Sequence, residues 1–237
     1  MKRKLPIVAI ICALLAFITY TSTIKHAKQK TIQVVGVSKT VKVNHKKAGN
    51  DSLTSQLQDI IGSQRVAAMV TKDGKTATFS QADQYSLGKG KEALVLAALL
   101  YGEEHGYIKN GQTAKVKKGD KTVKSHIAYG IAFLRQAMIK GSKAAIATLE
   151  RVVKKRSLKK YLQASNLTYS DGKMSLADFQ KLVIGVGLSS KKSVFLSAIN
   201  SKKKQGLYHF GNWRVNATVV IYGADHSLDS KILSLAA

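Results

Sequence analysis

The chain has 237 residues, of which 45% are hydrophobic, which is enough for one sizeable core and a tail but not clearly for two domains. It carries 39 Lys and Arg against 13 Asp and Glu, a formal net charge of +26, so an anionic setting is expected. A single cysteine, Cys12, excludes an intrachain disulfide. The six histidines show no metal-ligand spacing, so neither a metal nor a cofactor is expected.

The N-terminal segment predicts a membrane anchor. Leu5 to Ile24 is uncharged and follows three cations, and as a helix it would span roughly 30 Å, about one hydrocarbon core. Tyr20-Thr21-Ser22-Thr23 is a poor signal-peptidase site, so an anchor over residues 1–24 is favoured over cleavage and secretion, which remain the alternative. The polar, Lys-rich residues 25–50 predict a basic stalk. The domain, residues 51–237, is expected outside the cytoplasm, because large downstream domains translocate largely regardless of flanking charge.

The kind of cation indicates the kind of partner. Lys greatly outnumbers Arg, whereas base readout and bidentate phosphate contacts favour Arg, so a specific nucleic acid is not expected. Dispersed Lys behind an export signal suits bacterial envelope material, either peptidoglycan stems or anionic wall polymers, with membrane contact through residues 5–24. A solvated basic surface without a dedicated partner is the alternative.

A helix and a strand hairpin are expected to open the domain. Apolar residues from Leu53 to Ile61 recur at helical spacing behind Asp51 and Ser52, which are good N-cap residues. Residues 65–70 and 76–80 then predict two strands joined by a turn with the Asp-Gly hairpin signal.

Helices are expected to fill the middle of the domain. Glu92 to His105 is apolar almost without interruption, which is typical of a helix buried on all sides, and Gly106 follows as its C-terminal residue. Further helices are expected at 127–139 and from Ala145 through Val153. A capping box at Ser175-Leu176-Ala177-Asp178 predicts another that continues to Val186.

Strands are expected to return at the C-terminal end. Residues 213–222 predict a strand, 223–226 a turn, and 227–235 another strand or a short helix. The fold class is therefore α+β, with an antiparallel sheet formed by N- and C-terminal strands and packed against a mostly helical central region.

From Leu53 to Leu235 this order of elements resembles the class A β-lactamase and penicillin-binding-protein-like family of serine acyl transferases. In that family a hairpin leads to Ser-x-x-Lys at the start of a buried helix, where the serine attacks an acyl carbonyl and the lysine helps to take its proton. Aligned on the buried helix, Lys91 falls at the lysine position, behind a Tyr85-Ser86 lead-in. The nucleophile position is then Gly88, which has no side chain to attack with.

A second register keeps the motif intact as Ser86-Leu87-Gly88-Lys89, two residues upstream of the helix entry. In that register Ser86 and Lys89 would be the catalytic pair. A third interpretation makes the segment a Gly-rich turn with solvated lysines and no relation to catalysis.

Two further motifs of the family can be placed by the same resemblance. Its Ser-Asp-Asn motif falls on Ser142-Lys143-Ala144, so Ser142 matches the relay hydroxyl and Ala144 replaces the amide that binds substrate. Its Lys-Thr-Gly motif, on an inner strand beside the serine, falls on His209-Phe210-Gly211. Gly211 is kept there for close backbone approach, and His209 replaces the permanent cation.

The resemblance also implies a glutamate for deacylation. No Glu follows Glu150, and Asp171 is the only acid near the expected loop, so efficient antibiotic hydrolysis is not expected.

Three hypotheses about function follow, and whether the chain is an enzyme stays open among them. The leading one is a membrane-anchored domain that has lost its catalysis and binds envelope material. The second is an active serine acyl hydrolase or transferase using Ser86 and Lys89. The third is a polyanion-binding surface protein in which the cleft is irrelevant.

Overall fold

The computed structural model describes residues 52–109 and 111–237. The expected anchor at 1–24, the stalk at 25–50 and the proposed boundary residue Asp51 lie outside the described residues and stay predictions. Within the described ranges, no helix is both long and apolar enough to cross a membrane.

A six-stranded antiparallel sheet combines the two ends of the domain, as the sequence predicts. The strand order is β2-β1-β10-β9-β8-β7, and β1 pairs with β10 from Ala67 opposite Tyr222 to Val70 opposite Val219. The Asp73-Gly74 turn joins β1 to β2 with positive φ at both residues, as the Asp-Gly signal requires. The strands are β1 Ala67–Lys72, β2 Lys75–Phe79, β7 Lys203–Lys204, β8 Leu207–Phe210, β9 Trp213–Val215 and β10 Val219–Tyr222.

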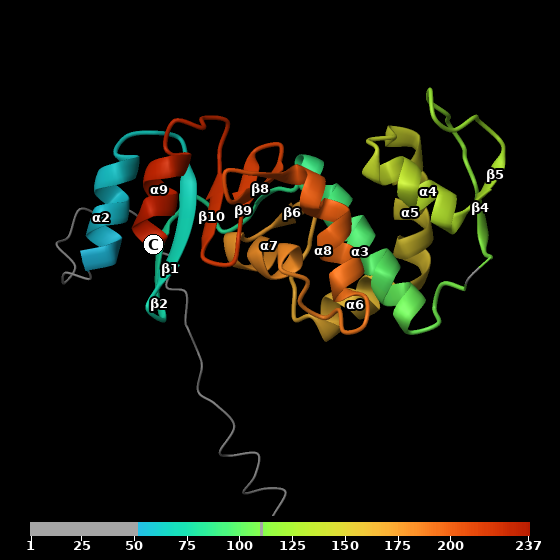
Figure 1. Cartoon of the computed structure of the whole chain (residues 1–237), viewed down its shortest axis with the longest axis horizontal. Coiled ribbons are helices and arrows are strands. Elements are labelled where there is room, and N and C mark those ends of the chain that lie inside the picture. The colour runs from blue at the N-terminus through green and yellow to red at the C-terminus, as the bar shows by residue number, and fades with distance from the viewer. Residues whose placement is uncertain (1–51, 110) are drawn as a thin grey trace, which may run out of the picture. The chain divides into compact units, whose positions relative to one another are not determined.

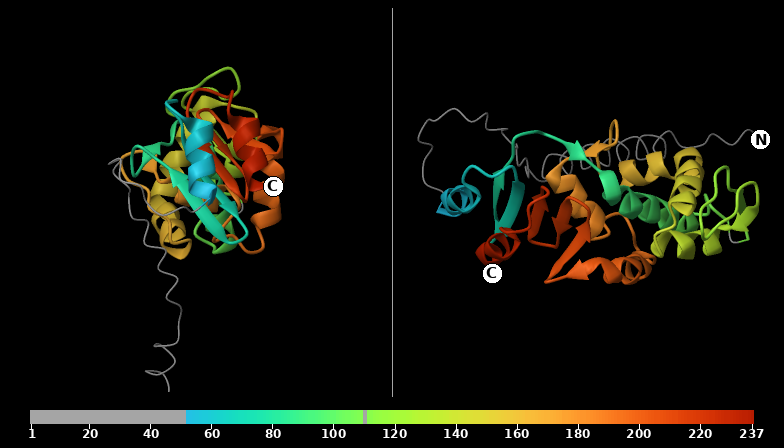
Figure 2. Two further views of the ribbon diagram at one scale, coloured as in Figure 1. Left: turned by 90° about the vertical axis from the view of Figure 1, so that its left-hand side faces the viewer. Right: turned by 90° about the horizontal axis from the view of Figure 1, so that it is seen from above.

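Helices cover both faces of this sheet (Figure 1). On one face, Ala68 and Ile221 belong to a core shared with α2 (Ser52–Ile61) and α9 (Asp229–Ala236). On the other face, Met69 and Val220 belong to a larger core shared with the central helices. Because side chains alternate along a strand, neighbouring residues of one strand serve different cores. Figure 2 shows α2 and α9 on the same side of the sheet.

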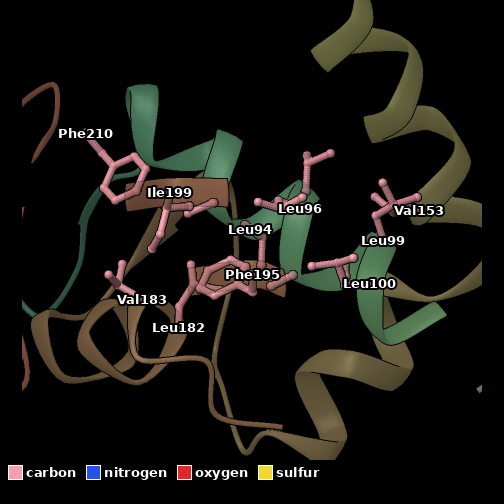
Figure 3. Close-up of a cluster of buried hydrophobic side chains, with 14 of the residues drawn as sticks. Leu94, Leu96, Leu99, Leu100, Val153, Leu182, Val183, Phe195, Ile199 and Phe210 are labelled. Atoms are coloured by element: carbon pink, nitrogen blue, oxygen red, sulfur yellow. The ribbon is translucent and has the colours of Figure 1, made fainter. Parts of the chain in front are cut away.

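The helix α3 (Lys91–Glu104) lies at the centre of the larger core, as its apolar sequence predicts. Every residue from Ala93 to Gly102 is buried. The helix ends where Gly106 takes a φ of 71°. Figure 3 shows leucines of α3 packed among side chains of three other helices, α5 (Lys143–Arg156), α7 (Leu176–Val183) and α8 (Lys192–Ile199). The residues that these helices contribute to the same core include Val153, Leu182, Val183, Phe195 and Ile199.

The remaining elements surround α3. Their bounds are α4 Ile131–Ile139, α5 Lys143–Arg156, α6 Leu158–Ala164, α7 Leu176–Val183, α8 Lys192–Ile199, η1 Gly88–Gly90 and η2 Asn200–Lys202. Two short strand pairs complete the list: β3 Tyr85–Ser86 with β6 Lys173–Met174, and β4 Thr113–Lys115 with β5 Ala128–Gly130. The predicted N-cap is present, because the Ser175 hydroxyl accepts from the N–H of Asp178 at the start of α7. The reciprocal half of the capping box differs, since the Asp178 carboxylate accepts from the Ser175 hydroxyl, and α7 ends at Val183 and not at the expected Val186.

Several expected boundaries are corrected by the structure. The single helix expected at 127–139 is a strand, β5, followed by α4. The single strand expected at 213–222 is the two strands β9 and β10, because the Asn216 side chain accepts from the N–H groups of Thr218 and Val219 and closes a turn between them. Residues 227–235 form most of α9, which resolves the choice between strand and helix in favour of helix.

A buried arginine ties β9 to the C-terminal helix. Arg214 is fully buried, and its guanidinium donates to both carboxylate oxygens of Asp229 in α9. Its other nitrogens donate to the carbonyl oxygens of Asn212, Gly223 and Asp225. Every nitrogen of the buried guanidinium therefore has a hydrogen-bond partner.

Candidate functional site

The start of α3 is built from a strand, a short 3-10 turn and the helix itself. β3 ends at Ser86, Leu87 is fully buried, and η1 then leads directly into α3. Gly88 opens η1 with a φ of 47°, a conformation that glycine adopts at little cost. A methyl group at Gly90 would lie 2.7 Å from the Phe179 ring, so the turn packs tightly on α7.

Ser86 belongs to the strand and not to the helix. It pairs with Lys173 of β6, and its carbonyl oxygen accepts a 3.0 Å hydrogen bond from the indole N–H of Trp213. Lys89 lies in η1, beyond the buried Leu87. The intact register therefore does not place its serine and lysine on one turn of a single helix, which is the arrangement the resemblance implies.

Gly88 and Lys91 are one turn apart, as the other register expects. The Lys91 N–H donates to the Gly88 carbonyl oxygen. The Lys91 ammonium lies 3.5 Å from Oε1 of Glu150 on α5, and Lys154 approaches the same oxygen at 3.0 Å. Burial raises the pKa of Glu150, but the hydrogen bond from Lys154 and the charge of Lys91 outweigh burial and lower it overall. Lys91 is thus the partner of Glu150, a pairing that the sequence does not indicate because the two residues lie far apart in the chain.

The residue that lies against Gly211 is Lys89. A methyl group at Gly211 would lie 3.3 Å from the Cβ of Lys89. Gly211 has a φ of 67° and occupies the turn between β8 and β9, so it is just beyond the strand on which the sequence analysis placed it. Glu92 follows Lys89 by one turn, and its Oε2 forms an ion pair with Lys202 Nζ at 3.1 Å.

This contact indicates a register that differs from both registers expected from the sequence. If the residue beside Gly211 marks the nucleophile position, Lys89 occupies that position and Glu92 occupies the lysine position. No serine is present at either. The sequence around Lys89 does not predict this register, because the contact that indicates it joins residues 122 positions apart in the chain.

Ser142 caps α5. Its hydroxyl accepts from the N–H of Ala145 at 3.1 Å and donates to Oδ2 of Asp120 at 2.7 Å. The N–H of Ala144 donates to the same carboxylate oxygen at 3.0 Å. The only proton of the hydroxyl is therefore already in a hydrogen bond. Asp120 is a further member of this group that sequence reasoning missed, because it comes from the loop between β4 and β5.

The hydrogen bonds hold Asp120 in its ionised form. The N–H of Ala144 is the largest contributor and the Ser142 hydroxyl the next, and together they move the pKa of the Asp120 carboxyl well below its ordinary value. Oδ1 accepts from the N–H groups of Thr122 and Val123, so the same side chain also shapes its own loop.

His209 lies on the other face of the sheet. Its neighbour Phe210 packs edge-on against Phe179 in the core that contains α3, whereas the His209 ring stacks 5.9 Å from the ring of His226, just before α9. Nε2 of His209 is 3.3 Å from the carbonyl oxygen of Lys204. Burial, the largest effect, lowers the pKa of His209. The structure therefore brings Gly211 to the start of α3 but does not bring His209 there.

In the part of the chain that is described, no three His, Cys, Asp or Glu side chains form a group that could hold a metal ion.

Comparison with solved structures identifies the fold. PBP-A matches with a TM-score of 0.57 and 11% sequence identity, over 78% of this chain and 93% of that one. A PBP-A mutant solved as an acyl-enzyme complex with penicillin G matches with a TM-score of 0.55 and the same identity and coverage. A β-lactamase from Burkholderia vietnamiensis matches with a TM-score of 0.51 and 13% identity, over 81% of this chain and 95% of that one.

The domain therefore has a β-lactamase-like α+β fold, as the resemblance implies. Its structural neighbours include class A β-lactamases and PBP-A, and they cover most of the chain at low sequence identity. No protein-family model matches the chain, and no curated protein matches its sequence.

Proposed function

We propose that this chain is a membrane-anchored extracytoplasmic protein whose β-lactamase-like domain has lost serine acyl chemistry and binds anionic envelope material. The observation that carries the proposal is the contact between Gly211 and Lys89 at the start of α3. The resemblance to the β-lactamase-like family implies a nucleophilic serine beside this glycine, and the residue beside Gly211 is a lysine.

The surrounding side chains support the same conclusion. Acyl transfer needs a nucleophile within hydrogen-bond reach of a base. Ser86 is on a strand, Lys91 is paired with Glu150, and the Ser142 hydroxyl is held by Asp120. Each group that could serve the reaction has another partner or another location.

The charges at the start of α3 favour binding of an anion. Lys89 is exposed, and within the described ranges it forms no ion pair. It stands in the 3-10 turn that leads into the N-terminus of α3, where the helix dipole adds positive potential. The carboxylates of a peptidoglycan stem or the phosphates of a wall polymer are the envelope groups that fit such a site. The anchor at 1–24 and the stalk at 25–50 would hold the domain near these polymers.

The decisive experiment measures acylation. Full-length protein, shown to be folded by circular dichroism, is incubated with a fluorescent penicillin and examined by intact mass and by gel, with Ser86→Ala and Ser142→Ala alongside. We expect no adduct on any of the three. An adduct on the unsubstituted protein that Ser86→Ala abolishes would instead establish the active-hydrolase hypothesis.

Binding is tested separately with soluble peptidoglycan stem peptides and with a teichoic-acid polymer. We expect Lys89→Gln to weaken binding of one of them by at least severalfold, while Lys155→Gln, an exposed lysine on α5, leaves it unchanged. Equal losses for the two variants would indicate attraction by total charge only, which is the polyanion-binding alternative.

A further inference from the structure

The segment 111–133 forms a lobe at the end of the domain opposite α2 and α9 (Figures 1 and 2). It consists of β4, the loop 116–127, β5 and the first residues of α4. The proposed function uses none of this lobe except Asp120.

The lobe exposes large apolar side chains. Ile127 is 43% exposed and Phe133 is 48% exposed; the only other large hydrophobic side chain exposed in the described ranges is Val194, on α8. The rings of Tyr129 and Phe133 stack at 5.1 Å. Tyr129 lies in β5, and Ile127 comes just before that strand. With Ile127, which is two residues before Tyr129 in the chain, this stacked pair makes up the apolar patch of the lobe.

The same lobe is rich in lysine. The lobe carries five exposed lysines, none of which forms an ion pair with any described residue: Lys115, Lys117, Lys118, Lys121 and Lys124. Its one acid is Asp120, whose carboxylate accepts hydrogen bonds from Ser142 and from three backbone N–H groups. The outward charge of the lobe is strongly positive.

The loop that carries the lysines is held in one shape. Val116 and Val123 are fully buried beneath it, and Asp120 fastens it to the start of α5. The N–H of Gly119 donates to the Ser125 hydroxyl at 2.8 Å, and a methyl group at Gly119 would lie 2.5 Å from the carbonyl oxygen of Val123. Binding through a preformed loop loses little conformational entropy.

We propose that the 111–133 lobe docks on the surface of an anionic lipid bilayer. Ile127 and Phe133 enter the boundary between headgroups and acyl chains, and the lysines contact the lipid phosphates. An anionic wall polymer would attract the lysines but would leave the apolar patch in water. An anionic lipid surface offers partners for both kinds of side chain. This inference does not depend on what happens at the start of α3.

The test reports on the lobe itself in the full-length protein. In a Cys12→Ser background, Phe133→Cys is labelled with an environment-sensitive fluorophore, and the protein is added to or reconstituted into phosphatidylcholine vesicles with or without one third phosphatidylglycerol. We expect a blue shift and quenching by spin-labelled lipid only with phosphatidylglycerol. The same label at Val194→Cys, the matched exposed apolar position, is expected to show neither.

Charge substitutions complete the test. Replacing Lys117, Lys118, Lys121 and Lys124 by Gln is expected to lower the partition coefficient measured from the Phe133 label by more than about tenfold. Four Lys→Gln changes elsewhere on the surface, at Lys155, Lys159, Lys192 and Lys231, are expected to change it less than about threefold. A Phe133 label that responds equally to both vesicles, or not at all, overturns the proposal. Polymer-only binding through the same lysines, without a shift at Phe133, overturns it as well.

Discussion

The Ser142 hydroxyl donates a 2.7 Å hydrogen bond to Oδ2 of Asp120, across 22 residues of sequence. The same hydroxyl accepts from the N–H of Ala145 and so caps α5. One pair of side chains thus fastens the loop between β4 and β5 to the helix that supports α3. In this chain the serine expected to act as a proton relay has a structural task.

Asp120→Ala is expected to lower the free energy of unfolding by about 1–2 kcal/mol at neutral pH, because the cap and the loop lose their shared acceptor. The folded-state pKa of Asp120 lies below its ordinary value of 3.8, so the stabilisation is complete above that value and is lost as the pH falls below it. Urea unfolding of the unsubstituted protein and of Asp120→Ala, at pH 7 and at pH 3, measures this difference in the free energy of unfolding. The exposed Asp83→Ala is the control, and a difference that persists undiminished at pH 3 would contradict the ionised-carboxylate explanation.

The register at the start of α3 can be tested by rebuilding the motif. Lys89→Ser with Glu92→Lys places a serine beside Gly211 and a lysine one turn later. We expect slow but detectable acylation by fluorescent penicillin on intact mass, in a Ser86→Ala background. Gly88→Ser with the native Lys91 is expected to give none, since a serine at a φ of 47° is strained and is not the residue beside Gly211. The opposite result would restore the register that the sequence analysis placed first.

Arg214→Met is expected to destabilise the domain by about 3–5 kcal/mol, because it leaves the buried Asp229 carboxylate with only the exposed His226 ring as a side-chain partner. Combining it with Asp229→Leu is expected to recover part of the loss, since the unpaired charge is then removed. Thermal and urea unfolding measure both, with the exposed Arg156→Met as control. If Arg214→Met lowered the free energy of unfolding no more than Arg156→Met does, the hydrogen bonds of Arg214 would contribute little to stability.

Gly102→Ala is expected to destabilise the domain, although Gly→Ala within a helix ordinarily stabilises it by up to about 1 kcal/mol. A methyl group there would lie 2.8 Å from Cδ1 of Ile108 and 2.9 Å from the Ser157 side chain. Ser157→Gly should relieve part of this clash, at the cost of the hydrogen bond from Ser157 to the Ala98 carbonyl oxygen. A double-mutant cycle in urea measures the coupling, and strictly additive effects would count against direct contact.

Local signals in the sequence predicted the parts of the fold that depend on neighbouring residues. The apolar run of α3, the Ser175 cap and the Asp73-Gly74 turn are each determined by a few adjacent side chains, and all three are present. The pairing of both chain ends in one sheet also followed from the order of elements. The strands β4, β5 and β3 were not predicted, because strands of two or three residues carry too few side chains to show alternation.

The sequence by itself determined the α+β class, the buried central helix, the strong positive charge and the resemblance to the β-lactamase-like family. Only the tertiary structure decided which residue lies beside Gly211, that Ser142 is bound to Asp120, and that His209 stacks on His226. The physical reason is that helix caps and apolar periodicity act over a few residues, whereas a site is made by contacts between distant segments. Sheet register and the direction of alternating side chains fix those contacts, and neither can be read from one segment alone.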